Sequence, residues 1–348
     1  MSPVVWDVVI VGAGYAGVAA ANRLSGKARV LVIAPRTCFV HRVRLHEVVA
    51  GRRPRIQIPL RFALRPRVRS VVGSAIHVDP GCVTLADGRR IRARQIIVAT
   101  GSDAHRPGGI GSLDDAKTAR EKVSLLGSGE RVLVRGGGLT GIELASELAD
   151  ARPDLKTHLV GRGKIGRQFP GRTRKELVDS LTRSGVILGE PSQDSALEIR
   201  ATGFRYSGLA ERSQLGTDAR GRVVLDENLQ AVPGIWGAGD SAVVPGRPYL
   251  RGGCAVAIPM GAHAADNALR ALERRSPKPF DFAFSQQCIS LGRHDGLIVR
   301  VDAYDRPTGS RLRGRPAAVT KSMVIAAALW TPIMVVPAYR WHSVHGSS

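Results

Sequence analysis

Two glycine triplets with the same spacing are the residues of this chain best suited to hold a phosphate. Each triplet follows an apolar, strand-like run and precedes helix-forming residues: Gly12, Gly14 and Gly17 after 4–11, and Gly136, Gly138 and Gly141 after 131–134. The first glycine permits a tight turn, the second lets the backbone approach a pyrophosphate, and the third lets helix and strand pack closely. Because the helix N-terminus favours anions, we predict two dinucleotide sites.

Charged residues near these loops could complete the two sites. Glu143 lies two positions after the last glycine of the second loop, near the start of its helix, where the helix dipole favours an acid. The acid that usually binds adenosine ribose is missing at Ala34-Pro35-Arg36, so Arg36 or backbone groups must serve there. Arg162, after the second strand of the second unit, could accept a 2′-phosphate or be a surface arginine, which leaves both NADH and NADPH open.

The elements that position these residues form a repeated pattern. A second strand is predicted over 29–33, and residues 71–99 alternate like a short meander. A helix is predicted over 142–150 and a strand over 197–201, without a second meander between 189 and 196. Further strands are predicted over 288–291 and 296–301. At roughly 150 residues per domain, the 348 residues fit two such units and a short extra piece.

Six segments together resemble a known family, the two-dinucleotide-binding flavoprotein reductases, and within it the type II NADH dehydrogenase-like branch. In chain order these segments are 12–17, 39–47, 99–102, 136–143, 234–240 and 290–293. The resemblance implies an α/β fold with two Rossmann-like domains, in which the nicotinamide domain is inserted into the FAD domain. We therefore expect an FAD domain over 1–108 and 222–277, a trimmed NAD(P)H domain over 109–221, and a C-terminal segment over 278–348 with an apolar tail.

The resemblance also implies roles for individual residues. Asp240 would hold the ribityl chain of FAD, Thr100 and Gly101 would line the flavin site, and Glu143 would be the catalytic residue facing flavin and nicotinamide. The full set expected around FAD is Gly12, Gly14, Tyr15, Ala16, Gly17, Arg36, Arg44, Thr100, Gly101, Gly239 and Asp240. The set expected around NADH or NADPH is Gly136, Gly138, Leu139, Thr140, Gly141 and Arg162.

The amino-acid composition argues against several other classes of function. The net charge is +22, yet aromatic residues make up only 5%, which leaves few stacking platforms for nucleic acid, so no nucleic-acid partner is expected. The cysteines at 38, 82, 254 and 288 lie too far apart for a redox dithiol or metal knuckle, so we expect no metal and no disulfide-reductase chemistry. A signal peptide cleaved in the first apolar run would destroy the first loop, which favours a cytoplasmic protein.

An apolar run over 323–338 leaves open whether the protein contacts a membrane. It spans sixteen residues and contains Pro332 and Pro337, which is shorter than the roughly 20 residues of a spanning helix. It either packs on the protein or lies peripherally in a membrane interface, as Trp330 and Lys321 beside it would allow.

The function expected from these features is an FAD-dependent NAD(P)H oxidoreductase. Hydride passes from NAD(P)H to FAD, and electrons pass on to a quinone or another small acceptor. The segment 254–263 lacks the glutamines that quinone-reducing members place beside the flavin. This departure leaves a flavin-dependent tailoring enzyme acting on a specific organic substrate as one alternative. The trimmed second domain and the missing ribose acids leave another, a flavin-binding protein that no longer uses nicotinamide. The oligomeric state is left open.

Overall fold

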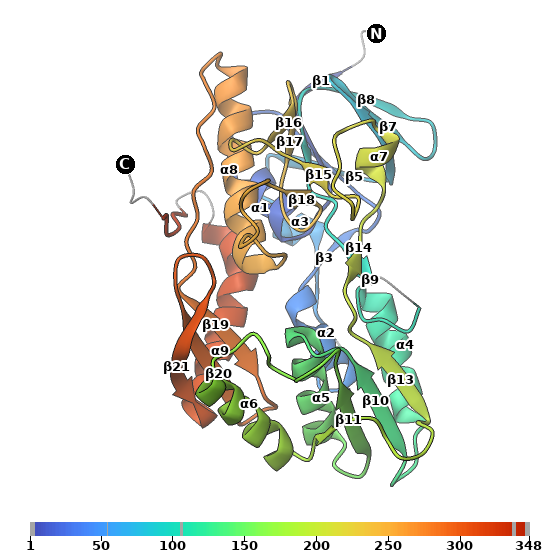
Figure 1. Cartoon of the computed structure of the whole chain (residues 1–348). Helices are drawn as coiled ribbons and strands as arrows, with labels where there is room; N and C mark the ends of the chain where they lie inside the picture. The colour runs from blue at the N-terminus through green and yellow to red at the C-terminus, as the bar shows by residue number, and fades with distance from the viewer. Residues whose placement is uncertain (1–3, 54, 105–106, 336–338, 345–348) are drawn as a thin grey trace.

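A computed structural model describes residues 4–53, 55–104, 107–335 and 339–344. Figure 1 shows two sheet-containing lobes, one above the other, with the C-terminal strands and helix α9 along one flank. The chain crosses between the lobes on two short antiparallel strands, β9 (Asp103–Ala104) and β14 (Phe204–Arg205). The fold is the predicted α/β class, with one mixed, mainly parallel sheet and one fully parallel sheet.

The first lobe is built on a sheet with the strand order β16-β17-β8-β1-β2-β5. Its bounds are β1 (Val5–Val11), β2 (Val30–Ala34), β5 (Val68–Val72), β8 (Arg90–Val98), β16 (Gln230–Val232) and β17 (Ile235–Gly237). Strand β1 runs parallel to β2 and β8, and β8 runs parallel to β17. The second half of β1 is fully buried because α1 (Tyr15–Leu24) and α8 (Cys254–Leu272) pack beside the sheet.

The predicted meander is shorter than the alternation of residues 71–99 indicated. Strands β6 (Ala75–Asp79), β7 (Cys82–Leu85) and β8 are antiparallel neighbours. Val71 instead belongs to β5, which pairs in parallel with β2. The sequence of a short strand with both buried and exposed positions is compatible with the parallel sheet and with the antiparallel meander. Its pairing is therefore known only from the structure.

The second lobe repeats the order of the first on a smaller scale. Its parallel sheet has the order β12-β11-β10-β13, with bounds β10 (Arg131–Arg135), β11 (Lys156–Val160), β12 (Ile187–Leu188) and β13 (Leu197–Arg200). Helices α4 (Leu113–Ser124), α5 (Leu139–Ala151) and α6 (Gly171–Arg183) accompany it. Helix α4 begins at a capping box, in which the Asp115 N–H donates to Ser112 Oγ at 3.1 Å.

Several short elements lie between the main strands and helices. Some of them pack in a different lobe from the one that the expected domain ranges assign to them. The short elements are β3 (Cys38–Val40), the 3₁₀ turn Arg42–Arg44, α2 (Leu45–Val49), β4 (Gln57–Pro59), α3 (Leu60–Ala63), α7 (Leu209–Arg212), β15 (Val223–Val224) and β18 (Ala242–Val243). Leu45 and Val48 of α2 lie in the core of the second lobe. Leu209 and Leu215 lie in the core of the first, so packing returns to that lobe before residue 222.

The C-terminal segment forms a third layer. Its antiparallel sheet contains β19 (Gln286–Ser290), β20 (Gly296–Val301) and β21 (Pro307–Arg313). The sequence predicted the first two strands but not β21, which is polar and largely exposed and so has no apolar alternation. Helix α9 (Gly314–Trp330) follows and continues into a π-helical turn, Thr331–Val335.

Helix α9 is longer than the apolar run predicted. The helix begins at Gly314 rather than at Met323, where the apolar run begins. The polar residues Thr320, Lys321 and Ser322 belong to the helix, although the apolar run excludes them. Within the described residues, Gly314–Met334 is the one helix whose length and composition would suffice to cross a membrane. Only 28% of its most apolar window is buried against the protein. Residues 336–338 of the predicted run lie outside the described residues.

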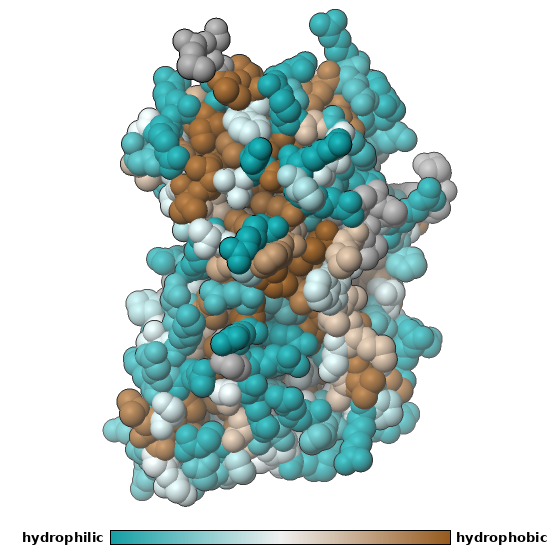
Figure 2. All heavy atoms as spheres, turned by 180° about the vertical axis from the view of Figure 1, so that it is seen from behind, coloured by the Kyte–Doolittle hydropathy of each residue, from teal (hydrophilic) through white to brown (hydrophobic). Residues whose placement is uncertain are grey.

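The π-helical turn is held firmly to the first lobe. The side-chain amide of Asn22 on α1 donates to Pro332 O at 2.9 Å and to Ala63 O at 2.8 Å. Arg65 donates to Met334 O at 3.0 Å. Apolar side chains nevertheless reach the surface, and the view from behind shows them gathered across the middle of the molecule (Figure 2).

Candidate active site

The first glycine loop has the geometry that its spacing predicts. Gly12 has φ +115°, and a Cβ there would lie 2.2 Å from Ala99 O. A Cβ on Gly17 would lie 1.9 Å from Gly12 O, so a side chain fits at neither position. A Cβ on Gly14 meets nothing within 4 Å. The loop is thus closed towards the protein and open at Gly14, where a pyrophosphate would approach the start of α1.

The second loop repeats this geometry. Gly136 has φ +147°, and its Cβ would lie 2.3 Å from Ala201 O. A Cβ on Gly141 would lie 1.9 Å from Gly136 O, whereas Gly138 again faces open space. Two copies of one detailed geometry support two sites for dinucleotides rather than chance occurrences of glycine.

A cavity of about 250 Å³ joins the two loops. It is bounded by the first loop at Gly14, Tyr15 and Ala16, and by the second at Thr140 and Glu143. The remaining wall comes from four other parts of the chain: Arg42, Val43, Leu45 and His46; Ala99, Gly101 and Ile110; Phe204 with Ala238, Gly239, Asp240, Gly252, Gly253, Cys254 and Ala257; and Lys321. A ligand in this cavity would touch both lobes and the C-terminal helix.

Asp240 lies on the wall of the cavity beside the start of α8. Its Oδ1 accepts from the Gly253 N–H at 2.8 Å, and its Oδ2 accepts from Ser102 Oγ at 2.8 Å. Gly239 has φ +76°, and its Cβ would lie 3.1 Å from the Cβ of Ala16, which brings this turn against the first loop. The two bonds fix the carboxylate where it can also accept from ligand hydroxyl groups.

Glu143 forms an ion pair with Lys321, a residue 178 positions later on α9. Lys321 Nζ lies 2.8 Å from Glu143 Oε1 and donates to Cys288 O at 2.7 Å, while the Ser290 N–H donates to Glu143 Oε1 at 3.0 Å. The two side chains are only 14% and 15% exposed. This pair connects the second lobe, the strand β19 and helix α9 at the wall of the cavity.

The pair is ionised. Burial alone would raise the pKa of the Glu143 carboxyl, but the Lys321 ammonium and the neighbouring His46 outweigh it, and the pKa lies below its ordinary value. Burial alone would lower the pKa of Lys321, but the Glu143 carboxylate raises it. His46, also on the cavity wall, has a lowered pKa because burial disfavours its charged form. Near neutral pH the proton that the two groups share therefore resides on Lys321 Nζ.

A second buried contact supports the floor of the cavity. Tyr15 Oη and His41 Nδ1 lie 2.9 Å apart, and the Val43 N–H donates to the same hydroxyl at 3.4 Å. Burial lowers the pKa of His41 to about 4, so the ring is neutral. Arg42 donates to Gly111 O at 2.7 Å, which fixes this cation at the crossing between the lobes.

The structure brings together some of the predicted site residues and leaves others apart. Arg36 lies on the surface in an ion pair with Asp114 at 2.6 Å, and Arg44 pairs with Glu47 at 2.5 Å; neither lines the cavity. Thr100 Oγ1 accepts from Ser207 Oγ at 3.4 Å. Leu139 and Gly141 lie in the first turn of α5, and Gly136 and Gly138 immediately before it.

Arg162 is exposed at the carboxyl end of β11. The preceding Gly161 touches the second loop, because its Cβ would lie 2.8 Å from Gly137 Cα. Arg162 therefore follows a residue that contacts the second loop, and its contact with a 2′-phosphate stays a prediction.

Several residues of the cavity wall were not among the predicted site residues, and those with polar, aromatic or thiol side chains are Arg42, His46, Phe204, Cys254 and Lys321. Arg42 and His46 belong to the 39–47 segment, where only Arg44 was selected. The available signal for Lys321 was a charge at the edge of an apolar run near the middle of its helix, because such a charge is costly unless it is paired.

The residues present fit the two cofactors. Open glycine loops at two helix starts, a fixed carboxylate at Asp240 and a shared cavity are what FAD and a nicotinamide nucleotide require of their protein. Fold and site together define the class of two-domain flavoprotein oxidoreductases that use NAD(P)H.

The chain belongs to the pyridine nucleotide-disulphide oxidoreductase family, whose model matches residues 6–193, more than half of its length. It is 27% identical over 339 residues to ferroptosis suppressor protein 1 of Taeniopygia guttata, covering 85% of this chain and 89% of that one. It is 25% identical over 396 residues to the type II NADH:quinone oxidoreductase of Staphylococcus aureus, covering 93% and 95%.

A solved structure shares the fold over nearly the whole chain. The sulfide:quinone oxidoreductase of Aquifex aeolicus superimposes with a TM-score of 0.77 at 16% identity, covering 96% of this chain and 92% of that one. The expected recognition, fold class and cofactors are confirmed: the protein is an FAD-dependent NAD(P)H oxidoreductase of the type II NADH dehydrogenase-like branch.

Proposed function

We propose that this protein oxidises NAD(P)H through bound FAD and delivers the electrons to a quinone, with Glu143 and Lys321 supplying a proton. The ion pair on the wall of the shared cavity carries the proposal, because it holds a proton beside the cavity that both loops border. The names of the relatives that act on quinones support the choice of acceptor.

Each part of the site has a defined task in this proposal. The backbone at Gly14 and the start of α1 binds the pyrophosphate of FAD, and Asp240 binds its ribityl hydroxyls. The second loop binds the nicotinamide nucleotide in the same way at Gly138. Bound together, these cofactors supply the hydride transfer, for which the protein needs only to orient the rings.

The proton chemistry belongs to the chain itself. Reduction of a quinone to the quinol takes up two electrons and two protons, so a proton donor near the acceptor lowers the barrier. Lys321 Nζ carries the available proton, and Glu143 Oε1 holds the ammonium in place at 2.8 Å. After the proton leaves Lys321, the carboxylate favours its return from water.

The exposed side of α9 supports a peripheral contact with a membrane, where a quinone would be dissolved. Met323 is 62% exposed, Trp330 49% and Met334 62%. The opposite side carries Lys321 and packs on the protein at Ala317 and Ile325. A helix with one packed and one apolar exposed side is suited to lie in the interface rather than to span the bilayer.

Rapid mixing of the purified holoprotein tests the electron-transfer proposal. NADH or NADPH should bleach the flavin absorbance in the absence of acceptor, and a water-soluble short-chain quinone should restore it. Glu143→Gln and Lys321→Met should leave the first step within a few-fold of the parent and slow the second by about 10²-fold, the lower range for a lost general acid. Lys117→Met, an exposed lysine of α4, is the matched control. Equal slowing of both steps by either variant would contradict the proposed proton role.

A further inference from the structure

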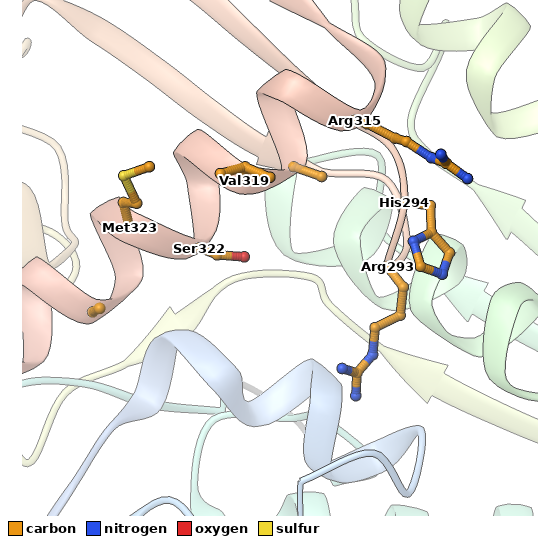
Figure 3. Close-up of a pocket in the computed structure, with 8 residues that line it drawn as sticks. Arg293, His294, Arg315, Val319, Ser322 and Met323 are labelled. Carbon is orange, nitrogen blue, oxygen red and sulfur yellow. The ribbon is translucent and has the colours of Figure 1, made fainter.

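A groove of about 480 Å³ lies between the start of α9 and the turn that joins β19 to β20 (Figure 3). It is separate from the cofactor cavity, since the two share no lining residue. The groove includes Arg293, the last residue of a segment that carried the family resemblance but received no role in cofactor binding. Its lining is Arg293, His294, Arg315, Ala318, Val319, Ser322, Met323 and Ala326.

One end of the groove is basic. Figure 3 shows Arg293, His294 and Arg315 there, near the first turn of α9. Arg293 Nε lies 3.9 Å from Glu147 Oε1, which is too long for a hydrogen bond. In the described part of the chain, no hydrogen bond or ion pair involves the side chains of His294 or Arg315. None of the described lining residues is acidic, and the one carboxylate paired with Arg293, that of Glu147, lies beyond hydrogen-bond distance, so the N–H donors of this end remain available to an anion.

The other end of the groove is apolar. Val319 is 56% exposed and Met323 is 62% exposed, and Ala318 and Ala326 complete this wall. Figure 3 shows Val319, Ser322 and Met323 following one another along the helix away from the arginines. A ligand that matches both ends has an anionic group at one end and an apolar chain at the other.

The apolar surface does not end with the groove. Further exposed apolar side chains follow at Trp330 and Met334, and Phe62 of α3 is 64% exposed. Helix α3 lies beside the π-helical turn, because Asn22 bonds to both Ala63 O and Pro332 O. Arg61 stacks on Phe62 at 4.8 Å from the ring centroid and places a cation at this far end as well. Exposed apolar side chains along the helix, with basic groups at both ends, match an anionic bilayer better than a dissolved anion.

We propose that the groove binds an anionic phospholipid of the bilayer, with its headgroup phosphate between Arg293 and Arg315 and the beginning of its acyl chain against Val319 and Met323. The inference rests on the proposed membrane contact of α9 and gives it a specific partner. Lys321 projects from the same helix into the cofactor cavity, so a lipid held here keeps that cavity beside the membrane.

Vesicle sedimentation of the full-length holoprotein, without turnover, tests the proposal. The vesicles are phosphatidylcholine alone or phosphatidylcholine with 30% phosphatidylglycerol. The double variant Arg293→Gln/Arg315→Gln should lose about 30-fold in partitioning to the anionic vesicles, at roughly five- to sixfold per arginine. It should change little on the neutral vesicles. The charge-matched control is Arg120→Gln/Arg220→Gln, which removes two exposed arginines outside the groove.

Two further measurements distinguish the occupants. Met323→Gln should weaken binding to both kinds of vesicle, and dissolved glycerol phosphate at the same headgroup concentration should not displace the protein. Unchanged binding of the double variant to anionic vesicles, or full displacement by glycerol phosphate, would overturn the proposal. Reduction of a short-chain quinone without vesicles is measured in parallel, so a failure of the proposed electron acceptor is seen separately from a failure of lipid binding.

Discussion

The ion pair between Glu143 and Lys321 provides the sharpest test of how this structure is held together. Lys321→Met nearly keeps the length of the side chain but leaves the Glu143 carboxylate buried, and among the described residues the Ser290 N–H is then its one remaining hydrogen-bond donor. Removing one partner of a buried pair costs about 3 to 5 kcal/mol, because the other charge loses its compensation. At roughly 2 to 4 °C per kcal/mol for domains of this size, the lower figure corresponds to a fall of about 6 to 12 °C in melting temperature.

The pH dependence of this effect has a definite sign. In the parent protein the folded pKa of Glu143 is depressed, so the stabilisation from the pair is present above the unfolded value near 4.3 and is lost as the pH falls. In Lys321→Met, burial would raise the folded pKa of Glu143 instead, so the penalty appears as the pH rises through about 4 to 7. The difference between variant and parent should therefore be small at pH 4 and largest at pH 7.5.

Circular dichroism and flavin fluorescence melts of the holoproteins measure this difference, with Lys117→Met as the control. The double variant Glu143→Gln/Lys321→Met should recover part of the lost stability, because no unpaired charge remains buried. A single variant that melts within about 1 °C of the parent at pH 7.5, or a double variant whose loss equals the sum of the two single losses, would refute the reasoning.

Three further outcomes follow from particular positions. Gly17→Ala places a Cβ 1.9 Å from Gly12 O and should lower the melting temperature of the protein, whereas Gly14→Trp, which extends into open space, should leave the fold intact and abolish FAD retention on gel filtration. Burial, then the Glu47 carboxylate, raises the pKa of Glu147 to about 7. The parent protein should thus lose about 3 kcal/mol of stability relative to Glu147→Gln as the pH rises from 4.5 to 7.5, measured by urea unfolding; parallel pH profiles would contradict this. Arg162→Ala should weaken NADPH roughly tenfold in flavin-bleaching titrations and leave NADH unchanged if this arginine accepts a 2′-phosphate; equal effects on both nucleotides would show that it does not.

The sequence by itself determined the two nucleotide loops. Gly12, Gly17 and their counterparts are required by contacts between residues that are close in the chain or in adjacent strands, and such requirements appear directly as spacing. The position of Asp240 was carried by a local motif in the same way, and the structure places it on the cavity wall.

Only the tertiary structure decided which side chains meet across the cavity. Lys321 reaches Glu143 because α9 packs on β19 and β20, and no periodicity of either segment encodes that pairing. Helix α2 likewise joins the second core although it lies in the sequence of the first lobe. Local turns and strands are specified by the residues that form them, whereas an ion pair between segments 178 residues apart depends on the packing of every layer between them.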